Sequence, residues 1–197
     1  MTFFSAKSIG VAILAVALST SMVSGATYKV DPAHSTIGFE VRHMVSTARG
    51  EFGQYVASFS FDPATEKLAN VVATINTASI DTRNKKRDEH LVSPDFFNTT
   101  KYPTLIFKGT KVVKTGKSEY AVHGTLTLLG VTKPVTLKAV HTGNAKSPWG
   151  QEVVGFSATA KINRQDFGMK WSKALDNGGV LVGNDITLSL QIEAIKQ

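Results

Sequence analysis

The sequence predicts an all-β protein, an antiparallel barrel in preference to a sandwich, with a short helical insertion around residues 82–92. Nearly every segment after residue 27 alternates apolar and polar residues with a period of two, which is typical of strands that bury one face. Turn residues separate these segments into about seven to nine strands, as in antiparallel sandwiches and barrels. Only Asp81–Pro103 interrupts the alternation, with a long charged stretch.

The first 26 residues predict a cleaved signal peptide. Lys7 precedes an apolar run from Ile9 to Leu18, and the small residues of Ser24–Ala26 suit a cleavage site. The run is too short to cross a bilayer, which takes about 20 residues, although an uncleaved anchor is the alternative. We therefore expect export to a bacterial periplasm and one mature domain over residues 27–197.

Composition narrows the classes of function. The chain has no cysteine, which excludes disulfides, a thiolate nucleophile and a cysteine metal site. Its formal net charge is +7, one unit of which belongs to Lys7. In an exported protein this charge favours transient contact with anionic membrane surfaces or lipid headgroups over nucleic acid.

Alternation defines the strands in chain order. Phe39 and Val41 alternate with polar residues in the first strand, and the last strand alternates without exception. Turns are expected at Asp62-Pro63 and over Gly130–Pro134. The predicted strands are Ser35–Arg42, Tyr55–Phe61, Leu68–Thr77, Thr104–Lys108, Tyr120–Leu128, Val135–Ala139, Val153–Ile162 and Ile186–Ala194.

The inward faces of these strands are rich in phenylalanine, while the outward positions hold Thr, Ser, Lys and Glu. A closed barrel of about eight strands is either filled by its side chains or holds one small ligand. Most apolar linings of this kind are packed cores, so both interpretations stay open at this point. The predicted channel lining is Phe39, Val41, Phe52, Phe59, Phe61, Ile75, Phe107, Leu126, Leu128, Leu137, Phe156 and Leu188.

The segment Asp81–Pro103 predicts a helix from about Thr82 to Val92, with Asp81 as its N-cap. We expect Leu91, Phe96 and Phe97 to anchor this segment against the barrel. It could then cover an opening of the barrel and present charged groups there.

Polar side chains near the openings could meet the headgroup of a ligand in an otherwise apolar pocket. Arg164 has a second interpretation, a structural ion pair, because it precedes a tight turn at Gly168 and an inward plug at Phe167. A solvated helix face is likewise the alternative for the charges of the insertion. The predicted headgroup or cover residues are His34, Arg87, Asp88, His90 and Arg164.

No catalytic constellation stands out. Ser35 lacks the Gly-x-Ser-x-Gly elbow of a nucleophilic serine, and no Walker loop or dinucleotide fingerprint is present. A metal-dependent hydrolase that uses His34, His43 and His90 is an alternative, but the histidines lack tight ligand spacing. We therefore predict no catalytic residue, no metal and no cofactor. A stress-related structural protein with a filled barrel is the other alternative.

Four ordered motifs mark a match that covers essentially the whole mature chain: DPAHSTIGFEVRH, RDEHLVSPDFFNTTKYPTLIFKG, HGTLTLLGVTKPVTL and INRQDFGM. In these motifs the sequence resembles the YceI-like family of bacterial polyisoprenoid-binding proteins. The resemblance implies an eight-stranded lipocalin-like barrel, a periplasmic location, a homodimer and no catalytic activity. It also implies a long apolar channel that holds a polyisoprenoid or similar amphipathic lipid, such as an isoprenoid quinone, a polyprenyl carrier or a fatty-acid derivative.

Overall fold

The computed structural model describes residues 25–174 and 179–197, so most of the predicted signal peptide lies outside the described residues. Strands dominate, with one α-helix and two short 3-10 helices among the described residues. The elements are β1 (Ala26–Val30), β2 (Thr36–His43), β3 (Ser46–Phe52), β4 (Tyr55–Asp62), β5 (Lys67–Asn76), η1 (Thr77–Ser79), β6 (Ile80–Asp81), α1 (Lys85–Leu91), β7 (Thr104–Lys114), β8 (Glu119–Leu128), β9 (Val131–Lys146), β10 (Glu152–Asn163), η2 (Arg164–Phe167) and β11 (Val182–Lys196).

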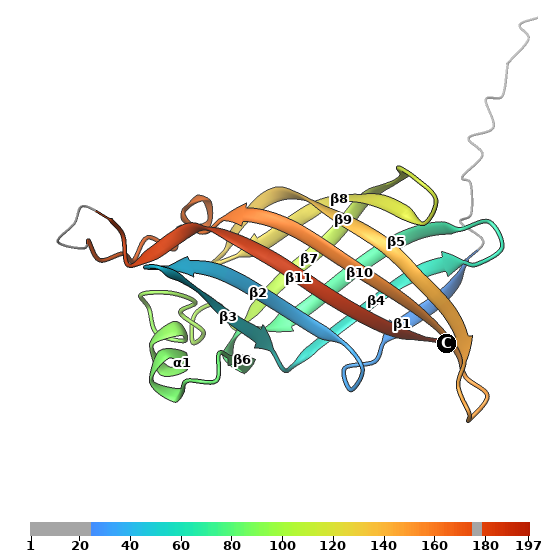
Figure 1. The fold of residues 1–197 in the computed structure, drawn as a ribbon, viewed down its shortest axis with the longest axis horizontal. Helices are drawn as coiled ribbons and strands as arrows, with labels where there is room; N and C mark the ends of the chain where they lie inside the picture. The colour runs from blue at the N-terminus through green and yellow to red at the C-terminus, as the bar shows by residue number, and fades with distance from the viewer. Residues whose placement is uncertain (1–24, 175–178) are drawn as a thin grey trace, which may run out of the picture.

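Eight of the strands close into an antiparallel barrel (Figure 1). The hydrogen-bonded order is β1-β4-β5-β7-β8-β9-β10-β11, and β11 pairs with β1 to complete the ring. The closing pairs run from Tyr28 opposite Lys196 to Val30 opposite Ala194. The predicted eight-stranded barrel with a short helical insertion is therefore confirmed.

The strand β2 replaces β1 along the same edge of β11. After Val30 the chain turns, and β2 pairs with β11 from Thr36 opposite Gln191 to Val41 opposite Ile186. Because β3 pairs with β2 and β6 pairs with β3, these three strands form a flap that continues the wall beyond β1. The flap and α1 lie toward the same end of the barrel (Figure 1).

A β-bulge explains why the sequence from Leu68 to Thr77 alternates weakly. Asn70 has a φ of 54°, and the register between β4 and β5 shifts at this point. The Nδ2 of Asn70 donates a hydrogen bond to Oγ of Ser60 over 3.1 Å. A bulge adds a residue to one strand, so the period of two breaks there.

The turn predicted over Gly130–Pro134 is shorter than expected. It consists of Leu129 and Gly130, which both have positive φ, and β9 begins at Val131. Pro134 lies within β9 opposite Thr125, but β10 pairs with β9 only from Lys138 onward. Proline has no N–H to donate and is tolerated where a strand has a free edge.

The helix α1 begins later than predicted. Its N-cap is Asn84, whose side chain accepts a hydrogen bond from the backbone N–H of Arg87 over 3.1 Å. Asp81 accepts instead from the backbone N–H of Arg83, whose φ is 61°. A residue in the left-handed region cannot continue a right-handed helix, so the prediction that Asp81 caps the helix is wrong.

Aromatic side chains close the barrel interior where β4 leads into β5. Phe61 is fully buried there and packs edge to face against Tyr28 and Phe156. The ring of His141 lies 4.8 Å from the ring of Phe61, between centroids. These rings fill the interior at this end.

The insertion packs against the opposite part of the core. Phe96 and Phe97 are buried, and Leu91 is partly buried against the same cluster, so their predicted anchoring role is confirmed. Phe97 meets Phe52 edge to face with ring centroids 5.7 Å apart. Phe167 is also buried, as its predicted role as a plug requires. Within the described ranges, no helix has the length and apolar character of a membrane span.

Candidate functional site

A partly open apolar cavity lies inside the barrel between its two packed ends. The centre of a water molecule could occupy about 150 Å³ of this cavity. The protein surface that faces the cavity has no polar part. Ser58 is the only residue with a polar side chain along the described walls. Such a site offers shape and hydrophobic contact without fixed hydrogen-bond partners.

Eight of the twelve predicted lining residues lie on the walls of this cavity. They come from seven strands and from the end of β3, because the alternation correctly identifies the inward face of each strand. These residues are Phe52, Phe59, Ile75, Phe107, Leu126, Leu137, Phe156 and Leu188. Their contact with a ligand stays a prediction.

The other four predicted lining residues do not line this cavity, because the packed ends make it shorter than the barrel. Phe61 and Leu128 are buried outside it. Phe39 and Val41 lie on the flap, where a Cβ added at Gly50 would meet the ring of Phe39 at 2.6 Å. The ring of Phe39 therefore crosses over Gly50 and does not reach the cavity.

Several lining residues escaped the sequence analysis. Val122 and Leu126 share one face of β8, so the alternation alone could have identified Val122. Val30 gave no such signal because β1 is short and was not predicted. Val71 was hidden by the bulge at Asn70, which shifts the alternation of β5.

Arg87 and Asp88 bind the chain just before α1. The guanidinium of Arg87 donates to the Oγ1 and the carbonyl oxygen of Thr82, both over 2.7 Å. The Oδ1 of Asp88 accepts from the backbone N–H of Thr82 over 3.0 Å and from its hydroxyl over 2.5 Å. Both residues therefore lock Thr82 in place, and neither lines the apolar cavity.

His90 joins α1 to the segment after η2. Its Nε2 lies 2.8 Å from Oδ2 of Asp95, and its ring packs edge to face on both Phe96 and Trp171. His90 does not line the cavity. It belongs to the layer of side chains with which the insertion covers its end of the core. Its proposed contact with a headgroup stays a prediction.

Arg164 joins the segment after η2 to the start of β11 through hydrogen bonds. It is only 1% exposed, and burial lowers its pKa from the ordinary value. The guanidinium donates to the carbonyl oxygens of Gly183, Met169 and Trp171 at 2.7–2.9 Å and to Oδ1 of Asn184 at 3.1 Å. Its partners are backbone and amide oxygens rather than the carboxylate that an ion pair requires, and this placement gives no support to a headgroup contact.

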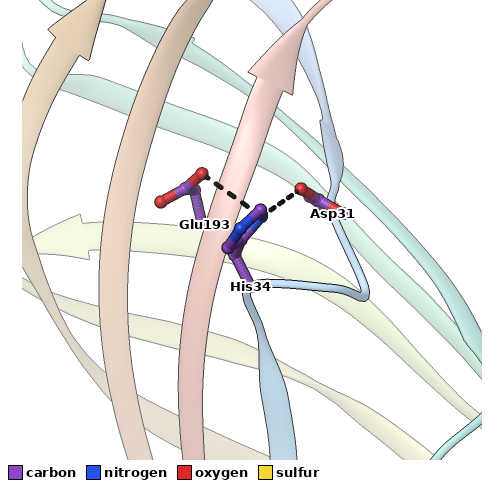
Figure 2. Close-up of side chains that lie close together, drawn as sticks. All are labelled: Asp31, His34 and Glu193. Atoms are coloured by element: carbon purple, nitrogen blue, oxygen red, sulfur yellow. Dashed lines mark hydrogen bonds and ion pairs between the residues drawn. The ribbon is translucent and has the colours of Figure 1, made fainter. Parts of the chain in front are cut away.

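His34 lies between two carboxylates at the corner between β1 and β2 (Figure 2). Its Nδ1 is 2.7 Å from Oδ2 of Asp31 and 3.9 Å from Oε1 of Glu193 on β11. The hydrogen bond between Asp31 and His34 raises the pKa of His34 and lowers that of Asp31. The corner is solvent-exposed and lies apart from the cavity lining.

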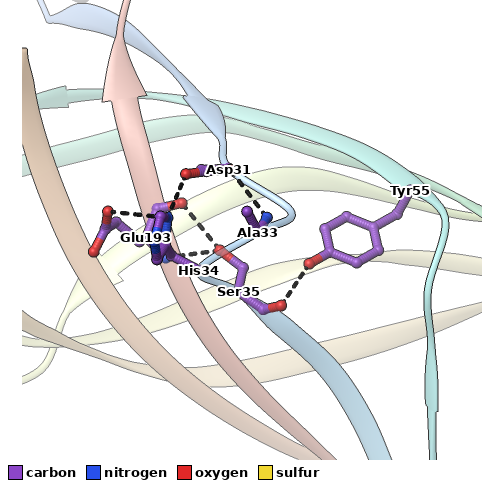
Figure 3. A network of polar contacts seen from close by, with 6 residues as sticks. All are labelled: Asp31, Ala33, His34, Ser35, Tyr55 and Glu193. Atoms are coloured by element: carbon purple, nitrogen blue, oxygen red, sulfur yellow. Dashed lines mark hydrogen bonds and ion pairs between the residues drawn. The ribbon is translucent and has the colours of Figure 1, made fainter.

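The same corner is tied to the barrel wall through Ser35 (Figure 3). The hydroxyl of Ser35 donates to the carbonyl oxygen of Glu193 over 3.0 Å and accepts from its N–H over 2.9 Å. The hydroxyl of Tyr55 donates to the carbonyl oxygen of Ser35 over 2.9 Å. These bonds fix the point at which β2 replaces β1 beside β11.

The histidines proposed for a metal-dependent hydrolase do not come together. Among the described residues, the group with suitable spacing for a metal is Asp31, His34 and Glu193, whose ligand atoms lie within 4.8 Å of one another. That group contains neither His43 nor His90. The hydrogen bonds at the corner between β1 and β2 explain why these three side chains lie close together.

A second hollow lies along the free edge of β3. This open groove of about 550 Å³ runs between the flap and the segment from Asp81 to Arg87, and it includes the ring of Phe39. Arginine and carboxylate side chains both line it, so it offers no excess of either charge. Of the predicted headgroup residues, Arg87 is the one that borders it.

The chain matches the family described as YceI-like domain over residues 28–194. It is 38% identical to Protein YceI of Shigella flexneri over 192 residues, which is 96% of this chain and 97% of that protein. A solved YCEI protein of Campylobacter jejuni is 36% identical with a TM-score of 0.70, over 79% of this chain and 89% of that one.

A third comparison extends the fold to a distant structure. A polyisoprenoid binding domain from Saccharophagus degradans has a TM-score of 0.64 over 88% of this chain and 99% of that one, with 12% sequence identity. At this identity the likeness shows the fold alone.

Proposed function

This chain belongs to the YceI-like domain family, and from that premise we propose that its barrel binds the apolar chain of a polyisoprenoid or similar amphipathic lipid. The observation that carries the proposal is the cavity inside the barrel, whose accessible wall surface is entirely apolar. A cavity of this kind favours a hydrocarbon chain over a polar substrate. Family and fold both indicate a binding protein rather than an enzyme.

The affinity of such a site comes from burial of hydrocarbon. Transfer of each CH₂ group from water contributes about 0.8 kcal/mol, so a few isoprene units give useful affinity. Because the lining offers no fixed polar partner, discrimination between isoprenoid and fatty-acyl chains should be weak. The headgroup then sets the orientation of the lipid more than its affinity.

Location forms part of the proposal. The N-terminal segment has the charge, apolar run and small residues of a cleavable signal peptide. We place the mature protein in the periplasm, where a carrier could hold an isoprenoid quinone or polyprenyl lipid away from water. Fractionation of the producing cells and N-terminal sequencing of the purified protein test this placement.

Native mass spectrometry of gently purified protein tests lipid binding, followed by organic extraction and uptake of added polyprenyl lipid. We expect a lipid adduct in the wild type. The variant A158L adds apolar volume at a lining position, so it should keep the barrel folded and lower lipid uptake by about tenfold through steric exclusion. The matched control V56L lies on the outward face of β4 and should take up lipid normally.

The rival function is a structural barrel with a filled interior. The aromatic packing at both ends of the cavity favours it. An empty wild-type barrel that takes up no prenyl lipid, with circular dichroism showing a folded protein, would establish the rival. Loss of uptake in both A158L and V56L would instead indicate a general defect in folding.

A further inference from the structure

Three large apolar side chains are exposed together at one end of the barrel. Met44 and Val45 form the two-residue turn between β2 and β3 and are 45% and 90% exposed. Val180, just before β11, is 53% exposed. The N–H of Met44 donates to the carbonyl oxygen of Leu181 over 3.0 Å, so the two loops lie side by side. We call Met44, Val45 and Val180 the apolar tip.

The turn residue itself is unusual. A two-residue hairpin turn with positive φ at its first position favours glycine there. Met44 has a φ of 49° and yet carries a long apolar side chain into solvent. The turn geometry does not call for an apolar residue at this position, and the exposed part of the Met44 side chain is open to a contact outside the chain.

Basic residues surround the apolar tip. Arg42 precedes it on β2, and Lys173 accepts a backbone hydrogen bond from Leu181. Lys170 lies three residues earlier, and all three basic side chains are exposed. In the described part of the chain, the ion pairs include none of them, while the nearby Asp185 is paired with Lys161 over 2.8 Å. Within the described residues, the rim therefore presents three basic side chains that no carboxylate pairs.

A chain of packed residues connects this tip with the cavity. Trp171 lies two residues before Lys173 and packs on His90 and Phe96. The neighbouring Phe97 packs on Phe52, which is part of the cavity wall. The end that exposes apolar side chains is thus the end covered by the insertion (Figure 1).

We propose that the apolar tip and its basic rim dock the protein on an anionic phospholipid bilayer. Met44, Val45 and Val180 enter the headgroup region while Arg42, Lys170 and Lys173 face the lipid phosphates. An interfacial surface gains from both buried apolar area and attraction to anionic lipid. This docking rests on the proposed function, because lipid binding in the barrel explains why the protein would contact a bilayer. Docking itself does not require a bound lipid.

Vesicle flotation tests the proposal with the purified protein. The vesicles consist of phosphatidylcholine alone or of equal parts of phosphatidylcholine and phosphatidylglycerol. We expect binding to the anionic vesicles, weaker binding at high salt, and little binding to the neutral ones. The double variant M44S/V45S should lower the partition coefficient about tenfold. K170Q/K173Q should weaken binding to anionic vesicles only.

A matched control separates docking from general surface hydrophobicity. Trp149 is 83% exposed on the loop between β9 and β10, at the opposite end of the barrel, so W149S should bind anionic vesicles like the wild type. Equal loss in W149S and M44S/V45S would overturn the assignment to the tip. Circular dichroism and an unchanged melting temperature show that each variant is folded.

Other outcomes separate this inference from the proposed function. Wild-type protein that takes up dispersed polyprenyl lipid but never floats with vesicles would overturn docking and leave lipid binding intact. Flotation without any lipid uptake would do the reverse. Sedimentation showing a wild-type dimer that M44S/V45S dissociates would assign the apolar tip to a second copy of the chain and overturn membrane docking.

Discussion

At the scale of single residues, polar side chains in this protein mainly fix the backbone. Arg164 donates hydrogen bonds to oxygens of the segment after η2 and of the start of β11. Arg87 and Asp88 both form hydrogen bonds with Thr82. A buried guanidinium needs such partners, because an unsatisfied buried donor costs about 1–3 kcal/mol. Residue type alone could not separate these structural roles from headgroup contacts.

The pair Asp31 and His34 gives a prediction at this scale. Its hydrogen bond raises the pKa of His34 above 6.5 and lowers the pKa of Asp31 below 3.8. The raised His34 pKa stabilises the fold at low pH, and this contribution is lost as pH rises through the folded-state pKa. The lowered Asp31 pKa stabilises it at higher pH, and this contribution is lost as pH falls. Their joint contribution is therefore largest between pH 3.8 and 6.5.

The variant D31N should move the pKa of His34 down toward its ordinary value, as followed by NMR titration of the imidazole. E193Q should move it less, because Glu193 lies farther from Nδ1 than Asp31 does. Equal shifts in the two variants would contradict this ranking. Urea midpoints of wild type and D31N should differ most inside the same pH window.

At the scale of elements, the flap depends on a glycine for its close packing. A Cβ at Gly50 would lie 2.6 Å from Cζ of Phe39 and 2.7 Å from Cγ2 of Thr82. We expect G50A to lower the free energy of unfolding by about 1–3 kcal/mol, because ring and threonine must both shift. The control G53A adds a Cβ whose nearest neighbour is at 3.8 Å and should change little. Urea denaturation measures both, and equal effects would show that the flap tolerates the clash.

The strands differ in how clearly the sequence predicts them. Strands with a buried face, such as β8 and β11, were predicted because their side chains alternate. The polar strand β3 was missed because its flap position buries little of it, and its pairing with β2 comes from backbone bonds that leave no trace in hydropathy. Most of the cavity lining follows from alternation, but its length depends on ring packing at both ends, which no local pattern encodes.

At the scale of the whole molecule, lipid binding and stability should be linked. A ligand that binds only the folded state stabilises it by about 2.7 kcal/mol at a hundred times its Kd. For a domain of this size each kcal/mol raises Tm by about 2–4 °C. We therefore expect polyprenyl lipid to raise the Tm of delipidated wild type by about 5–10 °C in scanning calorimetry. A shift of the same size in A158L would contradict binding in the cavity.

The ring closes only where β1 meets β11, with Tyr28 opposite Lys196. The two strands that seal the barrel are thus the first and the last to leave the ribosome. No shorter N-terminal portion can complete the ring, and contacts between such distant positions form slowly because a long loop must close first. The ring therefore stays open until β11 has been synthesised, which suits the export that we propose for this chain.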